Sequence, residues 1–487
     1  MPLSKDTLFY SIANWSTRIV GFIVAPVLIH FFTPEMFGKY NLIISIGTFC
    51  SILSLLAIVD QGLPRFFLDS KDEEERRSYV STSFVICSVG LAITTILIFL
   101  STPIVPFLLK DVKTPLIFTL LVAIICFSKS ILYMGSNMLK WTFQSPLFTK
   151  ITLAQTVVGA ILIISSVVFL GWRAEGVLVI SATVALGAGI WASHAIKNYI
   201  KLSSFSKEKL KELVLYAWPM LGLNIFAFFT RSLDRFFLAA LASFGAVGIF
   251  SVSFSVASLF ETLISGFFFA WGPHVLSTFK EPDAPNRYAS YFSLTSCLGI
   301  ISIITLGLWG SPIVMLIRPD GAYQEIGVFI PWIVSGTLLY YLGGYFSPGP
   351  MIAKKTYLKF IGFIIAATIN ALLNYILIPI LGILGAGIAT ATSSLIAGAY
   401  NQIISNRLFF VPNRWIFSFT YILIITSVVS FSQHNKFMGI FTEEFSYMHR
   451  IVFTIVLIIL GSLPFYRDIK NAGFLNKIST LILNRGH

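Results

Sequence analysis

The chain has 487 residues, of which 56% are hydrophobic and 11% are charged, and its formal net charge is +13. A water-soluble protein carries about a quarter charged residues, so this composition excludes a soluble globular domain and indicates a protein that faces lipid. Apolar stretches near the length of about 20 residues that crosses a bilayer occur fourteen times. The expected spans are 8–32, 39–63, 79–102, 114–138, 149–170, 174–196, 213–241, 246–271, 290–317, 325–346, 357–380, 383–404, 413–432 and 448–466.

The first span is too long for the apolar core of a signal peptide, and no small-residue cleavage site follows it, so we expect a retained helix. Basic residues predict the orientation, because cytoplasmic loops are enriched in lysine and arginine. With the N-terminus in the cytoplasm, 23 lysines and arginines fall in cytoplasmic segments, 7 in outer segments and 4 within spans. This distribution predicts that both termini are cytoplasmic, and it makes the net charge a topology signal rather than a sign of nucleic-acid binding.

A weak internal repeat appears when the chain is shifted by about 210 residues. Gly38 then falls on Gly248, and Gly171 and Gly382 coincide at a shift of 211. Because each repeat has an even number of helices, six, the second repeat starts on the same side of the membrane as the first. The halves are therefore expected to be parallel repeats with the substrate route between them. We therefore predict an all-α integral membrane protein with two six-helix bundles, residues 1–205 and 206–411. Residues 412–487 would add helices 13 and 14 and a cytoplasmic tail.

Residues 226–241 read FAFFTRSLDRFFLAAL and place three charged residues in an apolar span. A charge at mid-membrane costs about 2.5–3.5 kcal/mol on insertion scales, so it rarely persists without a role. Arg231, Asp234 and Arg235 are spaced i, i+3 and i+4, which puts them on one helical face where Asp234 can pair with either arginine. Asn224 lies two turns earlier on the same face.

The first helix carries a similar polar pair, Asn14 and Arg18, at i and i+4. Facing lipid would be costly for both stripes, so we expect them to line a hydrated cleft between the halves, where excess cation favours an anionic ligand. An internal salt bridge of Asp234 that only fixes helix packing is the alternative, and snorkelling to the headgroups is a third interpretation for Arg235.

Four further charged residues are candidates for the same region. Lys129 either lines the cavity or reaches the inner face. Glu261 and Asp60, with Asp234, are candidates for ion coupling or charge pairing. Arg65 lies at the cytoplasmic mouth, where the Gly-Pro of DQGLPR predicts a bend, and AWGPH at 270–274 predicts a matching bend in the second half.

Asn370 and Asn374, at i and i+4, are expected to form interhelical hydrogen bonds. The four cysteines have no paired spacing, and no zinc or nucleotide-binding motif occurs, so neither a metal nor a cofactor is expected.

These features resemble the polysaccharide-unit flippases of bacterial inner membranes, within the multidrug/oligosaccharidyl-lipid/polysaccharide exporter superfamily. The resemblance covers nearly the whole chain and rests on its length, the fourteen-helix pattern and three segments: HFFTPEMFGKYNLIISIGTF, DQGLPRFF and TRSLDRFFLAALASFGAVGIFSVSFSVASLFE. It implies a V-shaped pair of bundles around a central cationic cavity. It also implies that undecaprenyl-pyrophosphate-linked oligosaccharides are moved to the periplasmic leaflet by alternating access, for O-antigen or exopolysaccharide synthesis, with Arg18, Arg231, Arg235 and Arg65 in contact with the substrate.

Three other functions remain open. An ion-coupled multidrug extruder would be expected to place carboxylates rather than arginines in its cavity, and a lipid II flippase would share the cationic cavity. A membrane glycosyltransferase or polymerase would be expected to show a large external loop, whereas the outer stretch near 434–449 is short and contains only adjacent carboxylates, Glu443 and Glu444. The expected protein is not an enzyme. It is by default a monomer, coupled to H+ or Na+ if it is coupled, with polysaccharide polymerases or glycosyltransferases as candidate partners.

Overall fold

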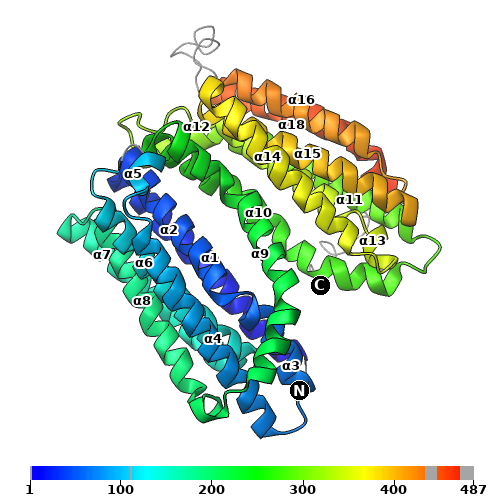
Figure 1. Cartoon of the computed structure of the whole chain (residues 1–487). Coiled ribbons are helices and arrows are strands. Elements are labelled where there is room, and N and C mark those ends of the chain that lie inside the picture. The colour runs from blue at the N-terminus through cyan, green and yellow to red at the C-terminus, as the bar shows by residue number, and fades with distance from the viewer. Residues whose placement is uncertain (1–2, 110–111, 434–446, 472–487) are drawn as a thin grey trace, which may run out of the picture. The chain divides into compact units, whose positions relative to one another are not determined.

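The computed structural model describes residues 3–109, 112–433 and 447–471, and within these ranges the regular structure is entirely helical (Figure 1). The predicted all-α membrane fold is confirmed. Thirteen helices among the described residues are long and apolar enough to cross a membrane, and a fourteenth, α18, has a shorter apolar stretch at Arg450–Tyr466. Glu443, Glu444 and the tail after residue 471 lie outside the described residues.

The chain divides into two compact units, of which unit 1 comprises Met1–Ser232 and Ser243–Gly248. Unit 2 comprises Leu233–Ala242 and Ile249–His487, so helices α9 and α10 contribute residues to both. The helices up to α10 are α1 Leu3–Phe31, α2 Pro34–Leu55, α3 Leu63–Asp69, α4 Glu73–Leu100, α5 Val105–Leu108, α6 Pro115–Trp141, α7 Ser145–Leu170, α8 Ala174–Ala195, α9 Lys207–Leu241 and α10 Phe244–Thr278. Those that follow are α11 Ala284–Ile317, α12 Ile326–Tyr345, α13 Gly349–Ile352, α14 Tyr357–Leu381, α15 Ile383–Leu408, α16 Trp415–Ser432 and α18 Tyr447–Asn471.

The predicted bend at DQGLPR is a complete break in the helix. α2 ends at Leu55, and Leu56 and Ala57 both adopt left-handed backbone conformations, with φ of 53° and 57°. A single π-helical turn, η1 (Ile58–Gly62), follows and leads into α3, which begins just before the proline. A left-handed conformation costs a non-glycine residue about 1–2 kcal/mol, so the fold sustains strain next to Asp60.

Corresponding glycines have corresponding places in the two units. Gly171 ends α7 with φ of 62°, and Gly382 ends α14 with φ of 57°. Each permits a short connection to the next helix, because glycine adopts positive φ without a steric penalty. The structure thus gives the two glycines that coincide in the sequence repeat the same local role.

Close helix crossings also recur. In unit 1, α6 packs on α8, where a Cβ on Gly135 would lie 2.7 Å from the Cβ of Ala192. In unit 2, α12 packs on α15, where a Cβ on Gly343 would overlap the Cα of Gly398. Small residues that bring two backbones together are the usual means of packing helices in a membrane, where lipid is as apolar as the side chains.

Replacing Gly343 with alanine is therefore expected to lower the melting temperature of the protein in detergent. The added methyl group has to push α12 away from α15, and overpacking of this kind costs about 1–3 kcal/mol. The matched control is Gly344→Ala, one residue away, where an added Cβ would meet nothing within 4 Å. Equal melting temperatures for the two variants would contradict this description of the crossing.

The last two helices of the described residues belong to unit 2: α16 packs on α11 and α12, and α18 packs on α11. Two tryptophan indoles attach them: Trp332 donates to the hydroxyl of Ser430 at 3.0 Å, and Trp309 donates to that of Thr454 at 3.1 Å. Although the sequence repeat does not include these helices, they form one wall of unit 2.

Candidate functional site

A cavity of about 660 Å³ lies within unit 1. Its wall combines residues of α2, η1, α6, α7 and the middle of α9. Figure 1 labels α2, α6 and α7 among the blue to teal helices of unit 1. The polar and charged residues in the wall are Thr48, Ser51, Asp60, Lys129, Tyr133, Ser136, Asn137, Lys140, Thr152, Gln155, Asn224 and Arg231.

Four of the residues predicted from sequence meet in this cavity: Asp60, Lys129, Asn224 and Arg231. Asn224 donates to the Asp60 carboxylate at 3.1 Å, which joins α9 to the π-helical turn. Lys129 donates to the hydroxyl of Thr48 at 2.6 Å. Lys129 thus lines a cavity within unit 1, while the cleft between the halves stays a prediction.

Sequence reasoning missed Lys140, which also lines the cavity. Its ammonium lies 5.1 Å from the ring centre of Phe148 and 3.4 Å from the Asn137 side-chain oxygen. A signal was available, because Lys140 follows Lys129 by eleven residues, about three helical turns, and so shares its face of α6.

Cationic side chains outnumber carboxylates among the residues that line the cavity. Three cationic side chains, Lys129, Lys140 and Arg231, face one carboxylate, Asp60, among the lining residues. Asp60 also accepts the Asn224 amide hydrogen bond. The arrangement suits a ligand that brings negative charge, because arginine and lysine both donate to phosphate or carboxylate oxygens.

Three other predicted residues are not part of this wall. Asn14 is exposed and Arg18 is half-buried on α1, which packs on α7. Arg65, on α3, forms an exposed ion pair with Asp69 at 3.0 Å, in the i, i+4 arrangement. The sequence could not distinguish these positions from those of the cavity, because helical spacing gives the face of a residue but not what that face meets.

Asp234 belongs to a separate polar cluster inside unit 2. Its side chain is 4% exposed, and its carboxylate accepts hydrogen bonds from Asn374 at 2.7 Å, Asn370 at 3.1 Å and the Thr390 hydroxyl at 3.0 Å. The prediction that the two asparagines join helices is confirmed, since they connect α14 to Asp234 of α9, while Thr390 connects α15 to the same carboxylate. Sequence spacing had suggested an arginine as the partner of Asp234.

Arg235 and Glu261 also lie in unit 2. The guanidinium of Arg235 stacks over the ring of Phe254 at 4.8 Å, on the neighbouring helix α10. Glu261 accepts a hydrogen bond from the Tyr341 hydroxyl at 3.2 Å.

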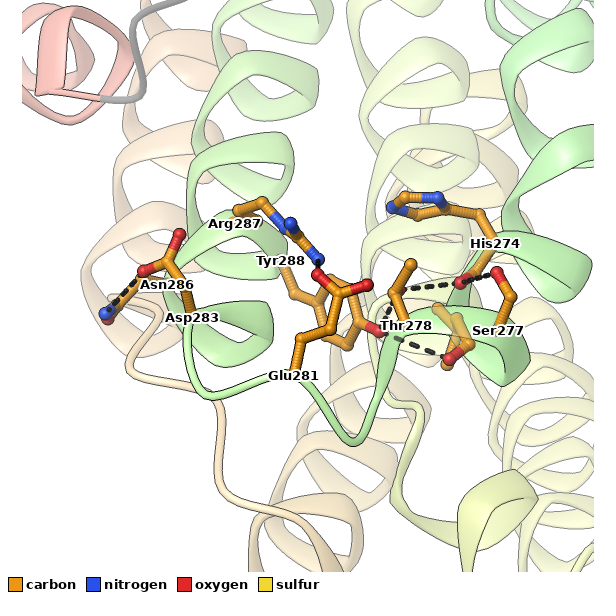
Figure 2. Close-up of polar contacts among 9 residues, drawn as sticks. His274, Ser277, Thr278, Glu281, Asp283, Asn286, Arg287 and Tyr288 are labelled. Carbon is orange, nitrogen blue, oxygen red and sulfur yellow. Dashed lines mark hydrogen bonds and ion pairs between the residues drawn. The ribbon is translucent and has the colours of Figure 1, made fainter.

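The second predicted bend, at AWGPH, differs from the first. α10 continues through Gly272 and Pro273 to Thr278, so the break that follows α2 has no counterpart here. A hydrogen-bonded connection to α11 follows (Figure 2): Thr278 contacts the Tyr288 hydroxyl at 2.8 Å, and Arg287 pairs with Glu281 at 2.6 Å.

Comparison with known proteins identifies the family to which the chain belongs. The model of the polysaccharide biosynthesis protein family matches residues 3–279. No curated protein sequence matches the chain.

Solved structures share the fold. A lipid II flippase, MurJ, in an inward closed conformation aligns with a TM-score of 0.70 at 17% identity, over 95% of this chain and 99% of that one. An inward-facing multidrug resistance MATE family transporter of the MOP superfamily aligns with a TM-score of 0.62 at 14% identity, over 80% and 94%. A MATE transporter of Vibrio cholerae aligns with a TM-score of 0.53 at 12% identity, over 85% and 99%.

These likenesses establish the fold, and the family match extends over more than half of the chain. The resemblance seen in the sequence is thereby confirmed: this multi-pass membrane protein belongs to the polysaccharide biosynthesis protein family.

Proposed function

We propose that the protein is a flippase that moves undecaprenyl-pyrophosphate-linked oligosaccharide repeat units from the cytoplasmic to the periplasmic leaflet by alternating access. The observation that carries the proposal is the excess of cationic side chains, Lys129, Lys140 and Arg231, over the carboxylate of Asp60 in the unit 1 cavity. A pyrophosphate supplies several anionic oxygens, and the forked donors of arginine match them in geometry. Family membership supports a role in polysaccharide synthesis.

The cavity also bears on the rival functions. A site for cationic drugs would need more carboxylate than cation, and the wall has the reverse. A lipid II flippase would use the same charges, so the substrate has to be separated from lipid II by experiment.

The Asp234 cluster is our candidate for ion coupling. A buried carboxylate surrounded by two amides and a hydroxyl binds H+ directly, or binds Na+ once the amide groups turn their oxygens towards the ion. Both ions change the charge of the cluster, and a site that couples transport has to differ in affinity between conformations. Glu261 and Asp60 are secondary candidates for the same role.

We further propose that the protein resides in the bacterial inner membrane with both termini cytoplasmic, since the basic residues are distributed in that sense. It would act as a monomer that receives its substrate from glycosyltransferases and delivers it to a polymerase. The remaining predicted contacts, Asn14, Arg18, Arg65 and Arg235, would engage acidic groups of the substrate along its path.

The deciding experiment is lipid extraction from cells that lack the gene. We expect completed, single-repeat undecaprenyl-pyrophosphate oligosaccharide to accumulate while surface polysaccharide disappears, and the wild-type gene to reverse both effects. Accumulation of lipid II would instead identify a lipid II flippase. Drug sensitivity without any build-up of lipid-linked sugar would favour the extruder.

Replacing Asp60 with asparagine is expected to strengthen pyrophosphate binding by the purified protein. The change removes the one carboxylate of the wall and keeps an oxygen that accepts from Asn224. In a water-filled cavity, removing a negative charge about 4 Å from a bound anion gains about 1 kcal/mol, or about fivefold in affinity. Titration calorimetry with inorganic pyrophosphate measures the affinities of the wild type and of Asp60→Asn. Weaker binding by Asp60→Asn would show that Asp60 helps to hold the ligand.

A further inference from the structure

A second cavity, of about 370 Å³, lies wholly within unit 2. Its wall is formed by the C-terminal part of α10, the C-terminal part of α12 with Met351 of α13, the N-terminal part of α14, and α15. These residues include none of those proposed above to bind the pyrophosphate or the coupling ion. The wall consists of Phe268, Trp271, Gly272, Pro273, Tyr340, Gly344, Tyr345, Met351, Lys359, Gly362, Phe363, Ala366, Ser394, Ala397, Gly398 and Asn401.

Aromatic rings dominate this wall. Phe268 and Tyr345 contact each other with ring centroids 4.4 Å apart, and Tyr340 lies 6.1 Å from Phe363 on α14. Trp271 is 3% exposed, and its indole donates to the Tyr345 carbonyl at 2.8 Å, which fixes the plane of its ring. Rigid, oriented rings present flat apolar faces at little entropic cost.

Three polar side chains, Lys359, Ser394 and Asn401, interrupt the aromatic surface. Lys359 donates to the Gly344 carbonyl at 2.8 Å, which uses one of its three ammonium hydrogens. The Asn401 amide lies against Gly362, where a Cβ would be 2.6 Å from its side-chain oxygen. The lining residues include no carboxylate. The wall therefore carries one positive charge, and a bound anion would offset the free-energy cost of removing that charge from water.

We infer that this cavity is a second substrate site, which takes a sugar ring bearing a carboxylate; the inference rests on the proposed function. The C–H face of a pyranose packs on aromatic rings, its hydroxyls bond to an amide, and its carboxylate accepts from an ammonium. A polyprenyl chain would use the rings but would leave the ammonium of Lys359 uncompensated. The volume is near the lower limit of small-ligand sites, about 300–1,000 Å³, which suits one ring rather than a long chain.

The test measures binding of three soluble probes to the purified full-length protein in phosphatidylcholine nanodiscs, which contain no sugar headgroup. The probes are glucuronate, glucose and inorganic pyrophosphate, and titration calorimetry measures the affinity of each. We expect the wild type to bind glucuronate about tenfold more tightly than glucose, because a charge-assisted hydrogen bond from Lys359 contributes an affinity gain of about that size. Lys359→Met should abolish this preference, and Lys359→Arg should retain it. The matched control is Lys355→Met, which removes an exposed charge four residues away.

The outcomes separate this inference from the proposed function. No preference for glucuronate in the wild type, or an unchanged preference in Lys359→Met at an unchanged melting temperature, overturns the sugar site. Pyrophosphate binding that Arg231→Ala abolishes and Lys359→Met leaves intact supports the unit 1 site whatever the result with glucuronate. If pyrophosphate fails to bind while the glucuronate preference follows Lys359, the proposed phosphate site is wrong and the sugar site holds.

Discussion

Replacing Arg231 with alanine is expected to lower export of the glycan by about 10- to 100-fold, because a charge-assisted hydrogen bond to the substrate is worth about 1.5–3 kcal/mol. Arg231 contributes the guanidinium among the residues that line the unit 1 cavity. After its removal, Lys129 and Lys140 are the cationic side chains that remain among the lining residues, together with the carboxylate of Asp60. Membrane insertion should be unchanged, since the substitution makes the helix more apolar.

Surface polysaccharide and lipid-linked intermediates in a complemented deletion strain provide the measurement. Arg231→Lys separates charge from geometry: partial recovery means that charge suffices, and none means that the forked donors are needed. Arg77→Ala removes an exposed arginine of α4 outside the cavity and serves as the control. Normal export in Arg231→Ala at normal protein levels would argue against a substrate site in this cavity.

Replacing Asp234 with leucine is expected to destabilise unit 2 by about 2–4 kcal/mol. The donors of Asn370, Asn374 and Thr390 would lose the acceptor that they share, and a buried donor without a partner costs about 1–3 kcal/mol. A lower melting temperature in detergent is the measurement. Asp283→Leu, at an exposed position of the same unit, provides the comparison.

Asp234→Asn distinguishes a structural role from ion coupling. Its amide keeps the shape and one acceptor, so the melting temperature should fall less than in Asp234→Leu, while any dependence of transport on Na+ or pH should disappear. If transport by Asp234→Asn keeps the ion dependence of the wild type, coupling resides elsewhere, and Glu261 becomes the next residue to test.

The apolar stretches were sufficient to predict most of the membrane helices, because lipid accepts only long apolar stretches whose backbone groups are bonded internally, although the expected span 39–63 is interrupted after Leu55. The positions of polar residues within apolar spans indicated which of them needed a role, and Asp60, Lys129, Asn224 and Arg231 lie around one cavity of unit 1. The form of the bend at DQGLPR was harder to predict. Glycine and proline indicated a change of direction, but the left-handed residues are Leu56 and Ala57, whose residue types do not favour that conformation.

Partners distant in the sequence were the hardest to predict. The neighbours of Asp234 along its own helix are arginines, and electrostatics therefore suggested a local ion pair. Its hydrogen-bond donors, Asn370 and Asn374, lie more than 130 residues later and meet it only when α14 packs beside α9. The asparagines were correctly predicted to join helices, but spacing within one helix contains no information about which helix they reach.

The attachment of the last two helices has a consequence for biosynthesis. Unit 1 has all its residues once the ribosome has passed Gly248. Unit 2 remains incomplete far longer, because Ser293 on α11 bonds to Asp468 of α18 at 3.1 Å, near the end of the chain. Trp309 and Trp332 have no indole acceptor on α18 and α16 until then. The first unit can therefore fold during translation, while the second completes its packing only after α16 and α18 have been made.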